Sequence, residues 1–215
     1  SPPLTGSSTL SRNLDALRHR FPALAQRLEH FPGKEQVRIL RAKDGCLAYG
    51  FEQQGRVIPV TDIQQPARRL QAQLDQLGPQ LADFTRPVLL IGLYPGNELQ
   101  SIFQHSEDIK TPHCPQPIFV CVDSMICLYG FLQVFDAAAL LESPRVQFFW
   151  HEDLPQFIDL LKTHPEVPHV FTLVSGANDP TLNKLLPPLG QFIQARETET
   201  HRLQAENEAY YNGIS

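Results

Sequence analysis

The chain has 215 residues, of which 42% are hydrophobic, and its formal net charge at neutral pH is −5. This length suffices for one medium domain, or for a small domain joined to a medium one, with a well-buried core. The acidic balance gives no electrostatic footprint for nucleic acid or anionic membrane. The sequence contains no run of about 18 apolar residues, the length that would be needed to span a bilayer.

The first predicted element is an amphipathic helix or helix pair. Leucine and phenylalanine recur in steps of three and four between Leu10 and Phe31, which gives the apolar stripe of such a helix. Proline is tolerated in the first turn of a helix but not in its interior, so Pro22 predicts two helices or one kinked helix. The opening SPPLTGSST has neither a basic n-region nor an apolar h-region, and it is not expected to be a signal peptide.

From Gln36 to Val60 the apolar period changes to that of strands. Asp44-Gly45 is a preferred type I′ hairpin dipeptide, and Gln54-Gly55 predicts a second turn. These signals predict a three-stranded antiparallel meander, separate from any parallel sheet. Such a meander is too small to be stable without helices on its face. With a further helix starting near Gln65, these elements predict a small subdomain over residues 1–84.

The strongest motif lies in the middle of the chain. Residues 88–91 form a short apolar run that is typical of a strand buried on both faces. Gly92 and Gly96 bound the turn that follows, and Asn97 opens a helix. The next buried strand ends on Asp123. This order of strand, glycine turn, helix and acid is that of a nucleotide-binding βαβ unit.

The glycine turn and the acid can be explained by ligand binding or by packing alone. Glycine lets a ligand approach the backbone, the helix N-terminus offers unpaired N–H groups, and the acid accepts hydrogen bonds from ribose hydroxyls. However, G-x-x-x-G is only half of the fingerprint, and a doubly wound fold that needs glycine for packing alone explains it equally well. Tyr94-Pro95 fills the middle of the turn, and we expect the Tyr94 ring to cover part of any cofactor cleft.

Helix and strand patterns continue to alternate after Asp123. Helices are predicted over residues 125–141 and 154–161, strands over 145–150 and 170–174, and a long helical tract over 182–211 that breaks at Pro187-Pro188. This alternation predicts an α/β protein. We expect a Rossmann-like, mainly parallel, doubly wound sheet over residues 85–195, preceded by the small α+β subdomain.

Residues 196–215 are expected to form a C-terminal helical extension. Their apolar stripe is interrupted, yet Leu203, Tyr210 and Tyr211 remain, and a terminal helix exposes such residues at some cost. We therefore expect the extension to project, fray or pack on a second copy. The chain would then be part of a longer protein, or would form a homodimer contact.

Ligands bind at the carboxyl ends of the strands in doubly wound folds. His151 could supply acid–base chemistry there, although a solvated loop histidine is the simpler explanation. Ser175 and Asn178 could bind a ligand or cap a helix. No catalytic residue is assigned, because no general base or nucleophile constellation stands out. The candidate ligand-binding residues are Gly92, Tyr94, Gly96, Asn97, Asp123, Glu152, Asp153 and Ser175.

The four cysteines show no C-x-x-C spacing. Reduced packing thiols in a cytoplasmic protein explain them better than disulfides or zinc ligands. His105 and His113 flank a polar loop near Cys114, but this spacing matches no standard ligand set. No metal site is predicted.

The order of motifs resembles the S-adenosylmethionine-dependent methyltransferase type of Rossmann fold. The resemblance rests on the glycine turn from Gly92 to Gly96, on Asp123, and on R-V-x-F-F-x-x-E-D before a helix. It implies that the turn brackets the methionine part of the cofactor, that Asp123 holds the ribose, and that Glu152 or Asp153 lies near the adenine. The usual turn is richer in glycine than this one.

A larger part of the chain, roughly residues 13–194, resembles the front part of the motility accessory factor family. The motifs are Asn13-Leu14 and F-P-A-L in the leading helix, the Asp44-Gly45 meander and the P-A-R-R-L helix. These are bacterial proteins linked to flagellin or surface glycosylation with nonulosonic acids, and related glycosyltransferases. In that family this region precedes the part thought to transfer sugar.

Two functions therefore stay open. The first is an accessory or recognition domain of a larger glycosyltransferase-type protein, not itself catalytic and without a cofactor, whose partner would be a nucleotide sugar or a protein acceptor. The second is a methyltransferase that binds S-adenosylmethionine. The matching small N-terminal part, which methyltransferases do not require, favours the first.

Overall fold

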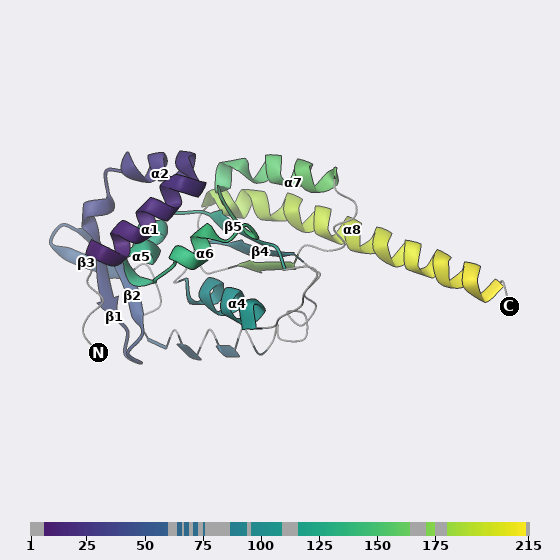
Figure 1. Cartoon of the computed structure of the whole chain (residues 1–215), viewed down its shortest axis with the longest axis horizontal. Coiled ribbons are helices and arrows are strands. Elements are labelled where there is room, and N and C mark those ends of the chain that lie inside the picture. Colours follow the sequence, from purple (N-terminus) through teal and green to yellow (C-terminus); the bar gives the residue numbers. More distant parts are fainter. Residues whose placement is uncertain are drawn as a thin grey trace.

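The computed structural model describes residues 7–59, 64–65, 67–68, 71–72, 75, 87–93, 96–108, 116–163, 171–174 and 180–213. Within these residues the chain forms a four-stranded parallel sheet with helices on both faces and a separate three-stranded antiparallel sheet (Figure 1). The predicted Rossmann-like α/β class is confirmed. The helix predicted from Gln65 falls mostly outside the described residues.

The parallel sheet has the order of the first four strands of a Rossmann fold, 3-2-1-4. Its strands are β4 (Val88–Ile91), β5 (Ile118–Val122), β6 (Val146–Trp150) and β7 (Phe171–Val174), arranged β6-β5-β4-β7. All three neighbouring pairs are parallel, so the four carboxyl ends share one edge. The strand order reverses between β4 and β7, the switch point at which such sheets bind ligands.

Alternate residues of β4 face opposite cores, as expected for a strand buried on both sides. Val88 and Leu90 pack into one core, and Leu89 and Ile91 into the other. The first core is covered by α4 (Asn97–Asp108), α5 (Met125–Val134) and α6 (Ala138–Glu142). The second is covered by α7 (Leu154–Lys162) and α8 (Pro180–Gly213). The sheet is therefore doubly wound.

The N-terminal stripe forms two helices, as Pro22 predicts. These are α1 (Ser7–Arg20) and α2 (Pro22–Glu29). Pro22 occupies the first turn of α2, where its missing N–H costs no helical hydrogen bond. Phe21, at the joint, is buried, and its ring centroid lies 5.4 Å from that of Phe148 in β6. This contact places α2 beside the edge of the parallel sheet.

The predicted meander is confirmed. After the short 3-10 helix η1 (Lys34–Gln36) come β1 (Val37–Arg41), β2 (Leu47–Gln53) and β3 (Arg56–Pro59). Both strand pairs are antiparallel, and none of the three strands pairs with the parallel sheet in the described part of the chain.

The predicted type I′ turn at Asp44-Gly45 is wrong. Hydrogen bonds from Ala42 N to Cys46 O (2.7 Å) and from Gly45 N to Ala42 O (3.0 Å) enclose three loop residues. Gly45 has a φ of 90°, but Asp44 has no positive φ, and its carboxylate instead accepts a hydrogen bond from Cys46 N at 3.0 Å. The pair of positive φ values that a type I′ turn needs occurs at Gln54-Gly55, at 51° and 75°.

The meander and the parallel sheet share a hydrophobic core. Tyr49 of β2 is fully buried, and its ring packs against Gly130 of α5, where an added Cβ would lie 2.6 Å from Tyr49 Cδ1. Leu17 and Leu24 from the two leading helices join the same cluster as the β4 residues Val88 and Leu90. The boundary between the N-terminal subdomain (1–84) and the Rossmann-like domain (85–195) stays a prediction.

The prediction of a single helix over residues 125–141 is wrong, because the chain forms two helices, α5 and α6, with a break between them. Asn13 of α1 reaches this break. Its side chain donates to Phe135 O at 2.6 Å and accepts from Ala137 N at 3.1 Å. These bonds replace helical hydrogen bonds at the end of α5 and the start of α6.

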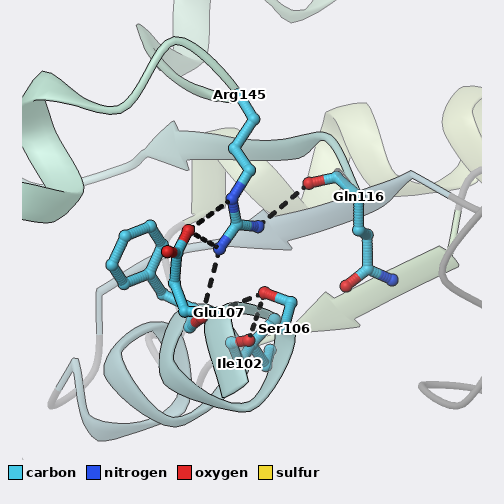
Figure 2. Close-up of polar contacts among 6 residues, drawn as sticks. Ile102, Ser106, Glu107, Gln116 and Arg145 are labelled. Atoms are coloured by element: carbon cyan, nitrogen blue, oxygen red, sulfur yellow. Dashed lines mark hydrogen bonds and ion pairs between the residues drawn. The ribbon is translucent and has the colours of Figure 1, made fainter. Parts of the chain in front are cut away.

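Arg145 fastens the opposite, amino edge of the parallel sheet (Figure 2). It precedes β6, and its side chain is 7% exposed. Its guanidinium donates to Gln116 O, just before β5, and to Phe103 O in α4, both at 3.1 Å. It also pairs with Glu107 of α4 at 2.9 Å. Arg145 therefore joins the starts of β5 and β6 to the end of α4.

The predicted break at Pro187-Pro188 is wrong, because α8 runs through both prolines. Both are exposed, while Leu186 and Leu189 beside them pack into the second core, so tertiary packing compensates for the missing N–H groups. The outer part of α8 projects from the body (Figure 1), and Tyr210 and Tyr211 are 67% and 72% exposed. No helix among the described residues is long and apolar enough to cross a membrane.

Candidate functional site

Three of the described strands deliver candidate residues to the carboxyl edge of the sheet. Gly92 follows β4, Asp123 follows β5, and the 3-10 helix η2 (His151–Asp153) follows β6. Asn97 begins α4, but its side chain is not among the described ones. Tyr94, Ser175 and Asn178 lie outside the described residues.

The two turn glycines both adopt backbone conformations that disfavour other residues. Gly92 has a φ of 90° and its N–H donates to Cys121 O at 2.8 Å. Gly96 has a φ of 109°, and an added Cβ there would lie 2.5 Å from Phe131 Cδ2 in α5. Gly96 is thus required by backbone and packing alone, which supports the rival explanation of the motif at this position.

Asp123 lies inside the edge rather than on its surface, with 3% of its surface exposed. The next residue, Ser124, caps α5 by accepting a hydrogen bond from Cys127 N at 3.4 Å. Burial raises the pKa of the Cys121 and Cys127 thiols to about 12, and the Asp123 carboxylate adds to both shifts. Asp153 also raises the pKa of Cys121, so the acids of β5 and η2 act on one thiol.

Of the η2 residues, His151 differs most from expectation. It is 6% exposed, so the interpretation as a solvated loop histidine is wrong. Its ring centroid lies 4.3 Å from that of Trp150, and its buried Nδ1 has no hydrogen-bond partner among the described residues. Glu152 and Asp153 beside it are exposed. His151 therefore packs into the edge, against Trp150.

Sequence reasoning missed the hollow that adjoins these acids, here called the α2–β6 groove. Its inner lobe, of about 240 Å³, is lined by Phe21, Pro22, Ala23, Leu24, Arg27, Phe148, Phe149, Trp150 and Asp153. Its outer lobe, of about 610 Å³, is lined by Ala23, Gln26, Arg27, His30, Phe31, Met125 and Trp150. The size of the outer lobe is within the range of small-molecule sites.

Arg27 and Trp150 separate the two lobes. The Arg27 guanidinium carbon lies 4.9 Å from the centroid of the Trp150 ring, a cation–π contact. A guanidinium nitrogen of Arg27 also lies 4.0 Å from a carboxylate oxygen of Glu152. Glu152 therefore belongs to the rim of this groove. In the sequence, the groove was signalled only by a tryptophan at the end of a predicted strand. The local pattern could not show that α2 packs beside Trp150, because α2 lies far away in the sequence.

Nothing in the described part of the chain resembles a metal centre. No group of three or more histidine, cysteine or acidic side chains there is close enough to hold an ion. Cys46, Cys121 and Cys127 are free thiols. His113 and Cys114 lie outside the described residues.

The fold of the chain has a counterpart among solved structures. The chain superimposes on the MAf glycosyltransferase from Magnetospirillum magneticum AMB-1 with a TM-score of 0.60 and 17% sequence identity. The likeness is one of fold. It covers 90% of this chain and 35% of that one, so the chain spans about a third of the length of that glycosyltransferase. Neither family models nor curated protein sequences give a match.

Proposed function

We propose that this chain is an accessory or recognition domain of a larger bacterial glycosyltransferase-type protein and that it is not itself catalytic. It would act in acceptor recognition or assembly, with a nucleotide sugar or a protein acceptor as its partner. The three parts would be residues 1–84, 85–195 and 196–215. Free thiols fit a reducing compartment such as the cytoplasm.

The observation that carries this proposal is the extent of the structural match. It covers 90% of the chain and therefore reaches beyond the parallel sheet, into the helices and the meander in front of it. The two share one hydrophobic core through Tyr49 and Gly130. A methyltransferase needs the parallel sheet alone, whereas this chain keeps both parts together.

The chemistry of the edge supports a non-catalytic role. The buried thiols are poor nucleophiles, because their pKa is raised to about 12. His151, the candidate acid or base, is packed against Trp150. Burial of these groups supports the proposal that the edge is not catalytic.

One observation favours the second candidate, an S-adenosylmethionine-dependent methyltransferase. Gly92 takes a positive φ, and it follows β4, which pairs with β5 as in a cofactor-binding unit. Against it, Asp123 is buried and would have to become accessible before it could hold a ribose.

A ligand titration separates the two candidates. S-adenosylmethionine, S-adenosylhomocysteine and nucleotide sugars are added to the chain while its thermal midpoint is measured. A ligand at about 100 times its Kd should stabilise the fold by about 2.7 kcal/mol. We expect no shift of the thermal midpoint with S-adenosylmethionine or S-adenosylhomocysteine. Micromolar binding of S-adenosylmethionine that Asp123→Ala abolishes would instead make the chain a methyltransferase.

A further inference from the structure

The two lobes of the α2–β6 groove differ in charge. The inner lobe is lined by one carboxylate, that of Asp153, together with the guanidinium of Arg27. The outer lobe is lined by Arg27, His30 and Gln26, and its other walls include the aromatic ring of Phe31. Among the described residues, no acidic side chain lines this outer lobe. The outer lobe is therefore the more electropositive of the two.

The polar groups of the outer lobe are mainly hydrogen-bond donors. The guanidinium of Arg27 and the indole nitrogen of Trp150 can only donate. Nε1 of Trp150 is buried and has no hydrogen-bond partner within the described ranges. Nδ1 of His30 lies 2.8 Å from the carbonyl oxygen of Gln26, so it carries the hydrogen of that bond. Nε2 of His30 is left for a ligand, and it donates when the ring is protonated.

The carboxyl end of α2 lies at this lobe, and its negative charge is offset. A helix carries a partial negative charge at its last carbonyl groups, which would repel an anion. Gln26 O accepts hydrogen bonds from both N and Nδ1 of His30, at 3.1 and 2.8 Å. Glu29 O accepts from the ammonium of Lys34 at 2.7 Å. The carboxylate of Glu29 is itself paired with Arg18, at 2.7 Å.

Arg27 is positioned by contacts that leave it able to bind an anion. Its guanidinium carbon lies 4.9 Å from the centroid of the Trp150 ring, and a cation–π contact of this kind does not use the N–H donors. Its ion pair with Glu152 is long, at 4.0 Å, and the two side chains are 47% and 64% exposed. Such exposed pairs are weak. An oxyanion in the outer lobe can replace Glu152 with a bidentate pair to Arg27.

We infer that the outer lobe of the α2–β6 groove binds an oxyanion, a phosphate or a carboxylate, through Arg27 and His30. This inference rests on the proposed recognition role and names the anionic group by which the partner would be recognised. The lobe has a volume of about 610 Å³, which leaves room for the small molecule that carries the anion.

Three ligands that share one sugar ring test the inference. Glucose 1-phosphate, glucuronate and glucose are titrated into the chain by calorimetry, and the emission of Trp150, the single tryptophan, is followed in parallel. We expect at least one of the two anions to bind and to change the emission, and glucose not to bind. The affinity for that anion should fall by at least about threefold between roughly 0.1 M and 1 M sodium chloride, because salt screens the attraction. A comparison of the two anions distinguishes a phosphate site from a carboxylate site.

Two substitutions beside the lobe should change the affinity in opposite directions. Arg27→Gln removes the cation and should weaken binding by about tenfold. Glu152→Gln removes the carboxylate that competes for Arg27 and should strengthen binding by about two- to threefold. Arg202→Gln, at an exposed ion pair on α8, is the matched control and should leave the affinity unchanged. Circular dichroism checks that each variant is folded.

Other outcomes would overturn the inference. It fails if neither anion binds, if glucose binds as tightly as the anions, or if Arg202→Gln weakens binding as much as Arg27→Gln. A loss of affinity in Glu152→Gln also contradicts it, since that carboxylate should compete with the ligand. Failure of the inference leaves the proposed function standing with a protein acceptor. That function fails on binding of S-adenosylmethionine, which these three ligands do not test.

Discussion

The carboxamide of Asn13 donates a hydrogen bond of 2.8 Å to the carbonyl oxygen of Leu132, which is 119 residues away in the sequence. The same side chain bonds Phe135 O and Ala137 N, and Asn13 is fully buried. One amide therefore joins the first helix to the break between α5 and α6. This joint holds the N-terminal helices on the sheet together with Arg20, which donates to Leu141 O and Val146 O.

Replacing Asn13 by alanine should destabilise the fold by about 1–3 kcal/mol, because it leaves buried backbone groups without partners. Urea unfolding followed by circular dichroism measures this change. Asn207→Ala, at an exposed position of α8, is the matched control and should change stability by less than about 0.5 kcal/mol. Equal effects of the two substitutions would show that the joint contributes nothing.

Gly96→Ala should destabilise the chain by about 1–3 kcal/mol even without any ligand. The reason is twofold, since φ is 109° and the new Cβ would lie 2.5 Å from the Phe131 ring. The control is Gly190→Ala in α8, where an added Cβ meets nothing within 4 Å. That change should be neutral or should stabilise by up to about 1 kcal/mol. A stable Gly96→Ala chain would show that backbone strain and packing do not require the glycine.

Arg145→Lys should destabilise the amino edge of the sheet although it preserves the charge. The planar guanidinium contacts Gln116 O, Phe103 O and Glu107 at once, and an ammonium cannot reproduce this fork. We expect a loss of about 1–3 kcal/mol in chemical unfolding. Arg202→Lys, whose ion pairs with Glu199 and Glu206 are exposed, should cost less than about 1 kcal/mol. A smaller effect at Arg145 than at Arg202 would refute this account.

Stability should fall as the pH rises above about 9. The thiols of Cys121 and Cys127 have a pKa of about 12 in the folded chain, against 9.0 ordinarily. Between these values the unfolded chain binds fewer protons than the folded one, so alkali favours unfolding, by up to about 1.4 kcal/mol per pH unit for each thiol. Burial also raises the pKa of Tyr49, which acts in the same direction.

Urea unfolding at several pH values between about 8 and 11 measures how the free energy of unfolding changes with pH. The double variant Cys121→Ala and Cys127→Ala should show a shallower slope, with the part due to Tyr49 remaining. Alkylation with iodoacetamide should label the partly exposed Cys46 before either buried thiol. An unchanged slope in the double variant would contradict the assigned origin of the pH dependence.

Local pattern in the sequence was enough to predict most elements of the fold. The apolar run at Val88–Ile91 predicted a strand buried on both faces, and the period of two after Gln36 predicted the meander. Pro22 predicted the joint between α1 and α2. In each case the signal lies within a few residues, because the spacing of apolar side chains states which faces a helix or strand buries.

Only the tertiary structure decided where these elements are interrupted and what they enclose. Asn13 divides the helix predicted over residues 125–141, and packing of Leu186 and Leu189 carries α8 through its two prolines. The groove between Arg27 and Trp150 arises because Phe21 packs on Phe148 and brings α2 to the edge of β6. Contacts between residues more than 100 positions apart depend on strand order and side-chain packing, and neither property is contained in the local periodicity of the chain.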